Sequence, residues 1–231
     1  MRPALCIVVP VLNEAAGLAA RLVDLEPFRR RGAHLVVVDG GSEDESLNIA
    51  RAHADLAFVG PRGRSAQMNA GAAACPADTL LFVHADTRLP ADADALVARA
   101  LAGSFAWGRF DVRIDSGRAP LRLVERMMNL RSRLTGIATG DQCIFVRHDL
   151  FRAVGGFPDI PLMEDIALSR RLLRHGRPAC LREQVITSAR RWERNGVWRT
   201  VFLMWRLRAA YFFGADPAQL ALRYGYGPRQ R

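Results

Sequence analysis

Residues 5–14 read Leu5-Cys6-Ile7-Val8-Val9-Pro10-Val11-Leu12-Asn13-Glu14, an apolar run that ends in polar residues. It predicts a buried strand over Leu5–Val9, because a run of Val, Ile and Leu is typical of strands covered on both faces. Three similar runs follow, and stretches with helical apolar spacing separate them. The strands are Leu35–Val38, Leu56–Val59 and Leu80–Val83, and the helices are Glu14–Phe28, Glu43–His53 and Ser65–Ala74. This alternation predicts an α/β fold with parallel strands and crossover helices.

In a parallel sheet the ligand lies beyond the carboxyl ends of the strands. The segments that follow the four predicted strands are all polar or rich in glycine: Pro10–Glu14, Asp39–Ser42, Pro61–Arg64 and His84–Thr87. We therefore expect the functional site at this edge of the sheet.

The second half of the chain is less regular. We expect helices over Ala91–Ala102, Leu121–Leu134, Met163–His175 and Trp198–Phe213, and strands over Phe105–Ile114 and Cys143–Val146. Gly176 and Pro178 predict the end of the third of these helices.

Length and composition predict one globular domain of 231 residues. The N-terminal Met1-Arg2-Pro3 leads directly into the first strand, so we expect no signal peptide. The net charge of +10 suits an anionic partner, although an arginine-rich proteome would produce it as well. The cysteines are scattered singly, which predicts free thiols in a reducing cytoplasm; they are Cys6, Cys75, Cys143 and Cys180.

Two of the polar segments have structural explanations as well as functional ones. Asn13 is a good N-cap, and Ser42 with Glu45 makes a capping box. Asp39 has no such explanation, and the two glycines after it permit the close approach of a ligand that donates hydrogen bonds.

The remaining polar segments are equally ambiguous one by one. Gly60–Ser65 is either a phosphate cradle with two arginines or a solvated loop. Asp86 either caps a turn or, with His84 on the same side of the strand, faces a divalent ion. Glu164-Asp165 either stabilises the start of a helix through the helix dipole or presents a general base. Thr139–Gln142 adds another polar turn.

In this order the segments resemble the inverting family-2 glycosyltransferases of the GT-A fold, from about Ala4 to Trp192. The resemblance rests on Val9–Glu14, Val38–Ser42, Asn69-Ala70-Gly71, His84-Ala85-Asp86, Gly155-Gly156-Phe157 and Glu164-Asp165. Through Gly140-Asp141-Gln142 and Arg190–Gly196 the chain also resembles a small bacterial branch described as radical-SAM/selenodomain-associated.

The resemblance implies transfer of a hexose from a nucleotide diphosphate-sugar, in the first place a UDP-sugar, to a hydroxyl acceptor. Asp86 would bind the divalent cation, Mn²⁺ or Mg²⁺, beside His84, and Asp165, next to Glu164, would deprotonate the acceptor. The implied substrate and nucleotide contacts are Pro10, Asn13, Glu14, Asp39, Arg64, Asn69, Asp141, Arg191 and Trp192.

Two positions depart from the family pattern. His84 stands where the family has the first acid of its Asp-any-Asp element, which puts the identity of the metal in question. Ser188 replaces the glutamine of the element that ends in Arg191-Trp192, so we expect single transfer and not polymer synthesis.

We divide the domain into a nucleotide-binding half (about 1–115), an acceptor and catalytic half (about 116–195) and a basic aromatic C-terminal segment (196–231). The arginines of that segment exclude a membrane span, so its helix either lies on the inner face of the membrane or docks on the domain or a partner subunit.

Two other functions compete with this one. Sugar-nucleotide pyrophosphorylases usually carry a basic glycine-rich loop after the first strand, where this chain has Val11–Glu14. A non-catalytic basic module for membrane or nucleic acid would explain the arginines. No nucleic-acid recognition motif is visible, however, so we expect no specific nucleic-acid partner.

Overall fold

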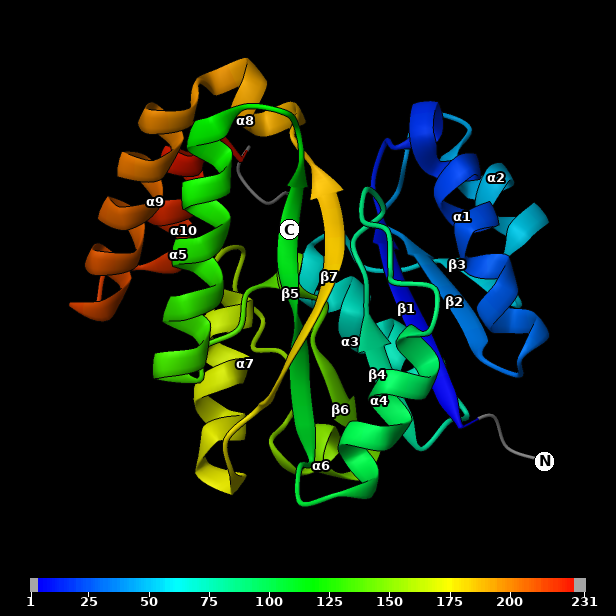
Figure 1. Ribbon diagram of the computed structural model, residues 1–231. Helices are drawn as coiled ribbons and strands as arrows, with labels where there is room; N and C mark the ends of the chain where they lie inside the picture. The colour runs from blue at the N-terminus through cyan, green and yellow to red at the C-terminus, as the bar shows by residue number, and fades with distance from the viewer. Residues whose placement is uncertain (1–3, 227–231) are drawn as a thin grey trace.

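Seven strands form one sheet in the order β3-β2-β1-β4-β6-β5-β7 (Figure 1). The computed structural model describes residues 4–226; the ends of the predicted domain, residues 1–3 and 227–231, lie outside the described residues. The strands are β1 (Leu5–Val11), β2 (His34–Asp39), β3 (Leu56–Val59), β4 (Thr79–Phe82), β5 (Trp107–Asp115), β6 (Phe145–Arg147) and β7 (Ala179–Ser188). The sheet is therefore mostly parallel, as predicted: only β6, between β4 and β5, runs antiparallel to its neighbours.

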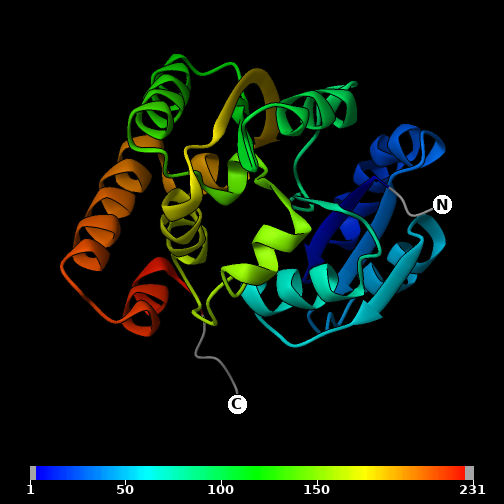
Figure 2. The same ribbon diagram turned by 90° about the horizontal axis from the view of Figure 1, so that it is seen from below.

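Helices cover both faces of this sheet (Figure 2). They are α1 (Ala15–Arg30), α2 (Ser46–His53), α3 (Arg64–Ala74), α4 (Ala93–Ala102), α5 (Ala119–Thr135), α6 (His148–Ala153), α7 (Glu164–Leu172), α8 (Arg190–Asn195), α9 (Val197–Phe212) and α10 (Pro217–Tyr224). Two 3-10 turns, η1 (Gly140–Gln142) and η2 (Leu173–His175), complete the described secondary structure. None of the helices within residues 4–226 has both the length and the hydropathy to span a bilayer.

The alternation of β1 divides the core into two layers. Ile7 and Val9 pack with α1 and α4 on one face, whereas Cys6 and Val8 pack with α3, α6 and α7 on the other. Helix α3 approaches the sheet very closely because it carries small residues: a Cβ at Gly71 would lie 2.4 Å from Cγ1 of Val8. Both faces of β1 are thus buried, as its apolar run predicts.

Several element boundaries differ from the prediction. β1 continues through Pro10 to Val11, because beyond Val8 it pairs only with β2 and needs no donor toward β4. The helix predicted over 163–175 is α7 followed by the separate turn η2. Strand β7 and the helices α6, α8 and α10 were not predicted, since β7 mixes charged and apolar residues and α6 and α8 have six residues each.

The prediction of four free thiols is wrong for two of them. Cys6 on β1 and Cys75, directly after α3, form a disulfide with their Cα atoms 6.1 Å apart. Cys143 and Cys180 are free. The close approach of α3 to the sheet brings together two cysteines that are 69 residues apart along the chain, which their sequence spacing gives no way to foresee.

Candidate active site

The segments that follow β1 and β2 hold each other in place. The backbone N–H of Asn13 donates to Ser42 Oγ (2.9 Å), and Asn13 Oδ1 accepts from the N–H of Glu43 (2.9 Å). Asn13 has a φ of 53°, so it forms the turn before α1 and is not its N-cap. Asp44 accepts from the N–H of Ala15 and thereby caps α1 from the second segment.

The predicted capping box of α2 does not form, because the helix begins at Ser46 and Ser42 serves the turn instead. Ser42 bonds to the carboxylate of Asp39, a residue that is only 1% exposed. One carboxylate oxygen of Asp39 accepts from the N–H groups of Gly41 and Ser42, and the other accepts from the Ser42 hydroxyl. The structure thus gives Asp39 the role of ordering its own loop.

Gln67 is a residue that the sequence analysis did not single out. Its buried side chain donates from Nε2 to the carbonyl oxygens of Val11 (2.7 Å) and Val38 (2.8 Å), at the carboxyl ends of β1 and β2. A Cβ at Gly40 would lie 3.1 Å from this amide. Gly40 therefore accommodates Gln67, whereas we had expected the two glycines to admit a ligand.

The third segment leads into α3, which carries Arg64 and Asn69. The Arg64 guanidinium lies 3.5 Å from Glu164 Oε1 and donates to the Tyr226 hydroxyl (2.9 Å). Asn69 bonds both to the N–H and to the carbonyl of Phe157, so it fixes the Gly155–Phe157 loop. Both the oxygen and the nitrogen of the Asn69 amide thus bond to the loop, which makes Asn69 a support of the site.

His84 follows β4 and meets the turn η1. Since β6 runs antiparallel, the residues before it lie at the same edge of the sheet as the residues after β4. His84 Nδ1 is accordingly 3.4 Å from Asp141 Oδ1, and Gly140 packs against the imidazole, where a Cβ would lie 2.6 Å from Nε2. Nε2 itself is buried and has no hydrogen-bond partner among the described residues.

Asp86 lies further along the same segment, with its side chain about one third exposed. Arg190, from α8, places its Nη2 atom 2.9 Å from Glu14 Oε2 and 3.7 Å from Asp86 Oδ2. A single guanidinium therefore bridges the carboxylates that follow β1 and β4. Burial raises the pKa of the Cys143 thiol, and the negative charges of Asp141 and Asp86 raise it further, so both carboxylates lie near this one thiol.

Glu164 and Asp165 begin α7. Asp165 Oδ2 accepts from the N–H of Gly140 (2.9 Å), and Oδ1 accepts from the N–H of Ile166 (2.7 Å), so the carboxylate is held beside η1. Glu164 is buried, and burial raises its pKa while the nearby Arg64 opposes that shift. His84, Gly140 and both carboxylates line one small cavity of about 10 Å³, close to the room that one water needs.

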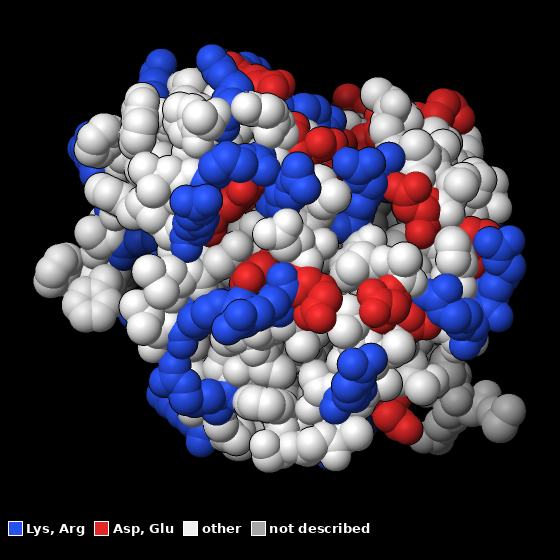
Figure 3. Space-filling model, viewed as in Figure 1, with Lys and Arg blue, Asp and Glu red and all other residues white. Residues whose placement is uncertain are grey.

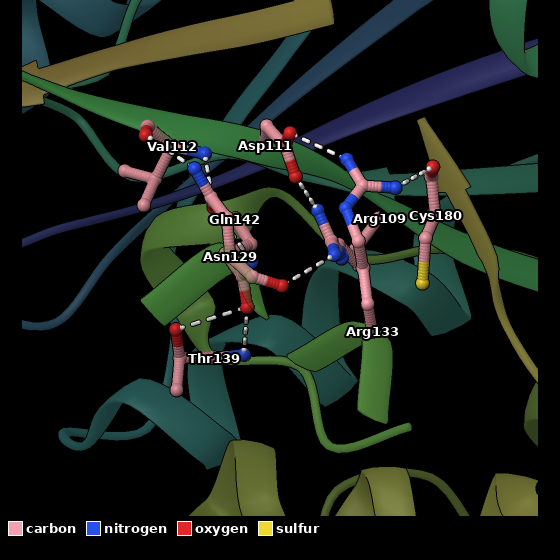
Figure 4. Close-up of polar contacts among 8 residues, drawn as sticks. All are labelled: Arg109, Asp111, Val112, Asn129, Arg133, Thr139, Gln142 and Cys180. Atoms are coloured by element: carbon pink, nitrogen blue, oxygen red, sulfur yellow. Dashed lines mark hydrogen bonds and ion pairs between the residues drawn. The ribbon is translucent and has the colours of Figure 1, made fainter. Parts of the chain in front are cut away.

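The turn η1 rests on a buried polar network (Figure 4). Gln142 accepts from the N–H of Thr139 and donates to Asn129 Oδ1, and Asn129 in turn bonds both backbone groups of Val112 on β5. Next to it, the carboxylate of Asp111 pairs with the fully buried Arg109 and with Arg133. The network joins β5 and α5 to the turn that contains Asp141 and donates a hydrogen bond to Asp165.

Arg191 and Trp192 belong to α8. The Arg191 guanidinium stacks 3.5 Å above the ring of Tyr224 and donates to its carbonyl (3.0 Å). Trp192 packs against the apolar cluster of Ile114, Leu121, Val124, Ala189 and Val197. In the described conformation both residues therefore support the C-terminal segment.

The predicted residues thus fall into two groups. One set lies around the edge of the sheet with side chains that meet across segments: Glu14, Arg64, His84, Asp86, Asp141, Glu164 and Asp165. Asn13, Asp39, Asn69, Arg191 and Trp192 bond or pack within the surrounding framework, and Pro10 is part of β1. Arg190 is predicted only as part of the longer motif Arg190–Gly196, because its contact with Glu14 spans 176 residues.

Within residues 4–226 no three His, Cys, Asp or Glu side chains gather closely enough to form a metal site by themselves. A divalent cation that binds together with a diphosphate needs only one or two protein carboxylates, because phosphate oxygens and water supply the other ligands. The part-exposed Asp86 fits that requirement with one carboxylate, and His84 lies two residues before it on the same segment.

A family model and a curated relative both relate this chain to sugar transferases. The model of "Glycosyl transferase family 2" matches residues 6–152. A curated relative, the undecaprenyl-phosphate 4-deoxy-4-formamido-L-arabinose transferase of Pseudomonas fluorescens, is 34% identical over 155 residues. That alignment covers 61% of this chain and 45% of the relative, so the chain spans less than half of the relative's length.

Solved structures share the fold at low sequence identity. The mannosyltransferase PcManGT from Pyrobaculum calidifontis, in complex with GDP-Man and Mn²⁺, is 20% identical with a TM-score of 0.66, covering 99% of this chain and 66% of its own. TarS from S. aureus, in complex with UDP-GlcNAc, is 18% identical with a TM-score of 0.66, covering 80% and 58%. Glucosyl-3-phosphoglycerate synthase from Mycobacterium tuberculosis, bound to Mn²⁺, UDP and glucosyl-3-phosphoglycerate, is 18% identical with a TM-score of 0.61, covering 97% and 81%.

Proposed function

Because the chain belongs to glycosyl transferase family 2, we propose that it transfers a sugar from a nucleoside diphosphate-sugar to the hydroxyl group of an acceptor, with inversion at the anomeric carbon. UDP is the proposed nucleotide. The observation that carries the proposal is the meeting of Asp165, Glu164, His84 and Asp141 around Gly140, at the edge of the sheet where Asp86 also lies. The donor would occupy the nucleotide-binding half, about 1–115, and the acceptor the half at about 116–195.

In the proposed reaction Asp165 is the general base. The N–H groups of Gly140 and Ile166 hold its carboxylate in one orientation. It takes the proton of the acceptor hydroxyl while that oxygen attacks the anomeric carbon, and the nucleoside diphosphate leaves with the electron pair of the broken C–O bond. Glu164, buried beside it, holds Arg64 near the site.

A divalent cation, Mn²⁺ or Mg²⁺, would be held by Asp86 with His84 nearby, and when bound it would neutralise the charge of the leaving diphosphate. The Arg190 guanidinium, which lies beside Asp86 and Glu14, would add positive charge at the same place.

The finer assignments are proposals too. The Gly140–Gln142 and Arg190–Gly196 motifs favour membership of the radical-SAM/selenodomain-associated branch. The relative with a lipid-phosphate acceptor supports peripheral contact of α9 with the inner face of the membrane. Disulfides are rare in a reducing cytoplasm, so the Cys6–Cys75 bond counts against the predicted cytoplasmic location. The location is proposed with the free thiols of Cys143 and Cys180 as its remaining support.

The function is tested by calorimetry and turnover on two variants. A screen of nucleotide sugars by thermal shift, with and without Mn²⁺ or Mg²⁺, first identifies the donor, since binding raises the melting temperature. Asp165→Asn should then bind this donor with unchanged affinity while turnover falls about 10²- to 10⁴-fold. Asp86→Ala should lose the part of donor binding that depends on the metal.

The matched control is Asp24→Asn, which removes an exposed carboxylate from α1 and should change neither quantity. Donor affinity that is insensitive both to EDTA and to Asp86→Ala would refute the metal role. Full turnover in Asp165→Asn would refute its role as the base.

A further inference from the structure

Helix α5 exposes an apolar stripe that the fold leaves uncovered. Leu123, Met127, Leu130 and Leu134 follow each other at intervals of four, three and four residues, so they lie on one side of the helix. All four are at least 44% exposed. The opposite side of the helix is buried and packs against β5 through residues such as Leu121 and Val124.

Helix α9 exposes a second stripe with larger side chains. Trp198, Phe202, Trp205 and Phe212 recur at intervals of four, three and seven residues, and Phe213 continues the stripe at the end of the helix. Their exposed fractions range from 52% to 85%. The buried side of α9 faces α7 and α10 through Leu207.

The two stripes face the same side of the molecule. Helices α5 and α9 lie side by side and run in the same direction (Figures 1 and 2), and Val201 packs into the cluster that contains Val124. Val124 and Val201 thus mark the sides on which the two helices meet. Viewed along each helix from its N-terminus, Met127 is rotated about 60° counterclockwise from Val124, and Trp205 is rotated about 40° clockwise from Val201. Because the helices are parallel, these opposite rotations place both stripes on the same face of the helix pair.

Arginines flank this common face on both sides. Arg126 lies beyond the stripe of α5, and Arg199 and Arg206 lie beyond the stripe of α9. All three are exposed, and none forms an ion pair with a residue of the described range 4–226. In Figure 3 the left part of the molecule, over α9 and α5, is largely uncharged with basic side chains around it.

We propose that the exposed stripes of α5 and α9, with these three arginines, form a docking face for the surface of an anionic lipid bilayer. Helix α9 contains no acidic residue, and the single acid of α5, Glu125, is buried. A second copy of the chain would bring the two sets of arginines against each other. A bilayer offers both acyl chains for the aromatic residues and phosphates for the arginines.

This face extends the proposed membrane contact from one helix to two. The reason for docking, access to an acceptor, rests on the proposed function, whereas the face itself is inferred from its exposed side chains. Helix α8, which carries Arg190 to Glu14 and Asp86, leads directly into α9. The docking face and the candidate site are therefore linked by one short helix, an arrangement suited to an acceptor that is held in a membrane.

Vesicle flotation of the full chain tests the proposal. The probes are vesicles of phosphatidylcholine with and without phosphatidylglycerol. We expect the protein to bind only the anionic vesicles, and binding to weaken about tenfold or more both in Phe202→Ser/Trp205→Ser and in Met127→Gln/Leu130→Gln. Arg126→Gln/Arg199→Gln/Arg206→Gln should abolish the preference for anionic lipid.

The control is Val23→Gln/Phe105→Gln, which removes two exposed apolar side chains outside this face and should leave vesicle binding unchanged. The melting transition of each variant, measured without lipid or donor, shows whether it is folded. The shift that the donor adds to this transition reports separately on the proposed function. Absence of vesicle binding would overturn the docking face, as would binding that the α5 variant leaves unchanged. A dimer in sedimentation that the same variants dissociate, without vesicle binding, would assign the face to self-association instead.

Discussion

Glu164 and Asp165 are neighbours in the chain, but their surroundings differ. Asp165 is held by two backbone N–H groups at the turn η1. Glu164 is buried, with Arg64 at 3.5 Å as its nearby cation. Burial of a carboxylate costs free energy unless its partners compensate for the lost water. The raised pKa of Glu164 indicates that the compensation by Arg64 is incomplete.

This difference predicts how stability depends on pH. A pKa raised above its ordinary value of 4.5 means that the contribution of Glu164 is complete below about pH 4.5 and is lost as the pH rises through the raised pKa. Glu164→Gln should avoid that loss. The unfolding free energy of Glu164→Gln, relative to that of the wild type, should therefore increase with pH. The increase should be about 1.4 kcal/mol for each pH unit by which folding raises the pKa of Glu164.

Urea denaturation of both proteins between pH 4 and 8 measures this. Glu183→Gln, on the exposed part of β7, serves as the control and should show no trend. A constant difference between Glu164→Gln and the wild type across this range would mean that the buried carboxylate is fully compensated.

Among the elements, α3 does most to shape the proposed nucleotide side of the site. It carries Gln67 beneath the ends of β1 and β2, Asn69 beneath the Gly155–Phe157 loop and Arg64 beside Glu164. It also packs against Val8 through Gly71. One helix thus fixes the relative positions of three segments that are far apart in the sequence.

Gln67→Leu tests this role of α3. The substitution keeps the side chain's approximate size but leaves the carbonyls of Val11 and Val38 without their donor. An unsatisfied buried polar group costs about 1–3 kcal/mol, so we expect a loss of unfolding free energy in that range, together with weaker donor binding. Chemical denaturation and calorimetry measure the two effects.

Gln219→Leu, on the exposed surface of α10, should change neither stability nor donor binding. Unaltered stability in Gln67→Leu would show that water or a shifted backbone replaces the amide.

The sequence predicted the elements of the first half well, because runs such as Leu35–Val38 are buried on both faces, as is typical of parallel strands. The expectation of a buried strand is wrong for β3, an edge strand whose Leu56 and Val59 are exposed. It missed β7, where Arg182, Glu183 and Gln184 interrupt the apolar pattern at an edge of the sheet. Caps and turns were the weakest part. Asn13 and Ser42 form hydrogen bonds with residues about 30 positions away in the chain. The spacing of residues within one short segment cannot predict such contacts.

For the site, chain order and strand ends predicted which acids gather at one edge. They could not predict that Asp39 turns into its own loop, or that Arg190 reaches Glu14 and Asp86. The Asp39 contacts are local, to residues two and three positions further on, but residue type alone does not distinguish such a turn from a ligand site. The Arg190 contacts depend on how the second half of the chain folds back over the sheet, which is a property of tertiary structure.

At the scale of the whole molecule, the disulfide closes a long loop. Cys6 and Cys75 are 69 residues apart, and the segment between them contains β1 to α3 with most of the predicted nucleotide contacts. Chain-entropy estimates for a loop of this size give about 4 kcal/mol of stabilisation through the unfolded state. The loop that the bond closes therefore lies within the proposed nucleotide-binding half.

Thiol titration checks this prediction. Protein denatured without reductant should expose two reactive thiols, from Cys143 and Cys180, and reduced protein should expose four. Cys6→Ser/Cys75→Ser should lose stability under non-reducing conditions by a few kcal/mol, whereas Cys180→Ser should lose little. Four reactive thiols in non-reduced, denatured protein would show that the bond is absent.

The place of β6 in the sheet affects how the molecule is made. β6 lies between β4 and β5 although it follows both along the chain, and β5 otherwise pairs only with the still later β7. At a synthesis rate of about 5–20 residues per second, β5 is without a sheet partner for roughly two to six seconds after it leaves the ribosome. During that interval both edges of β5 are open to other chains, and the edge that pairs with β7 stays open until residues 179–188 emerge, so aggregation of a newborn chain is expected at this step.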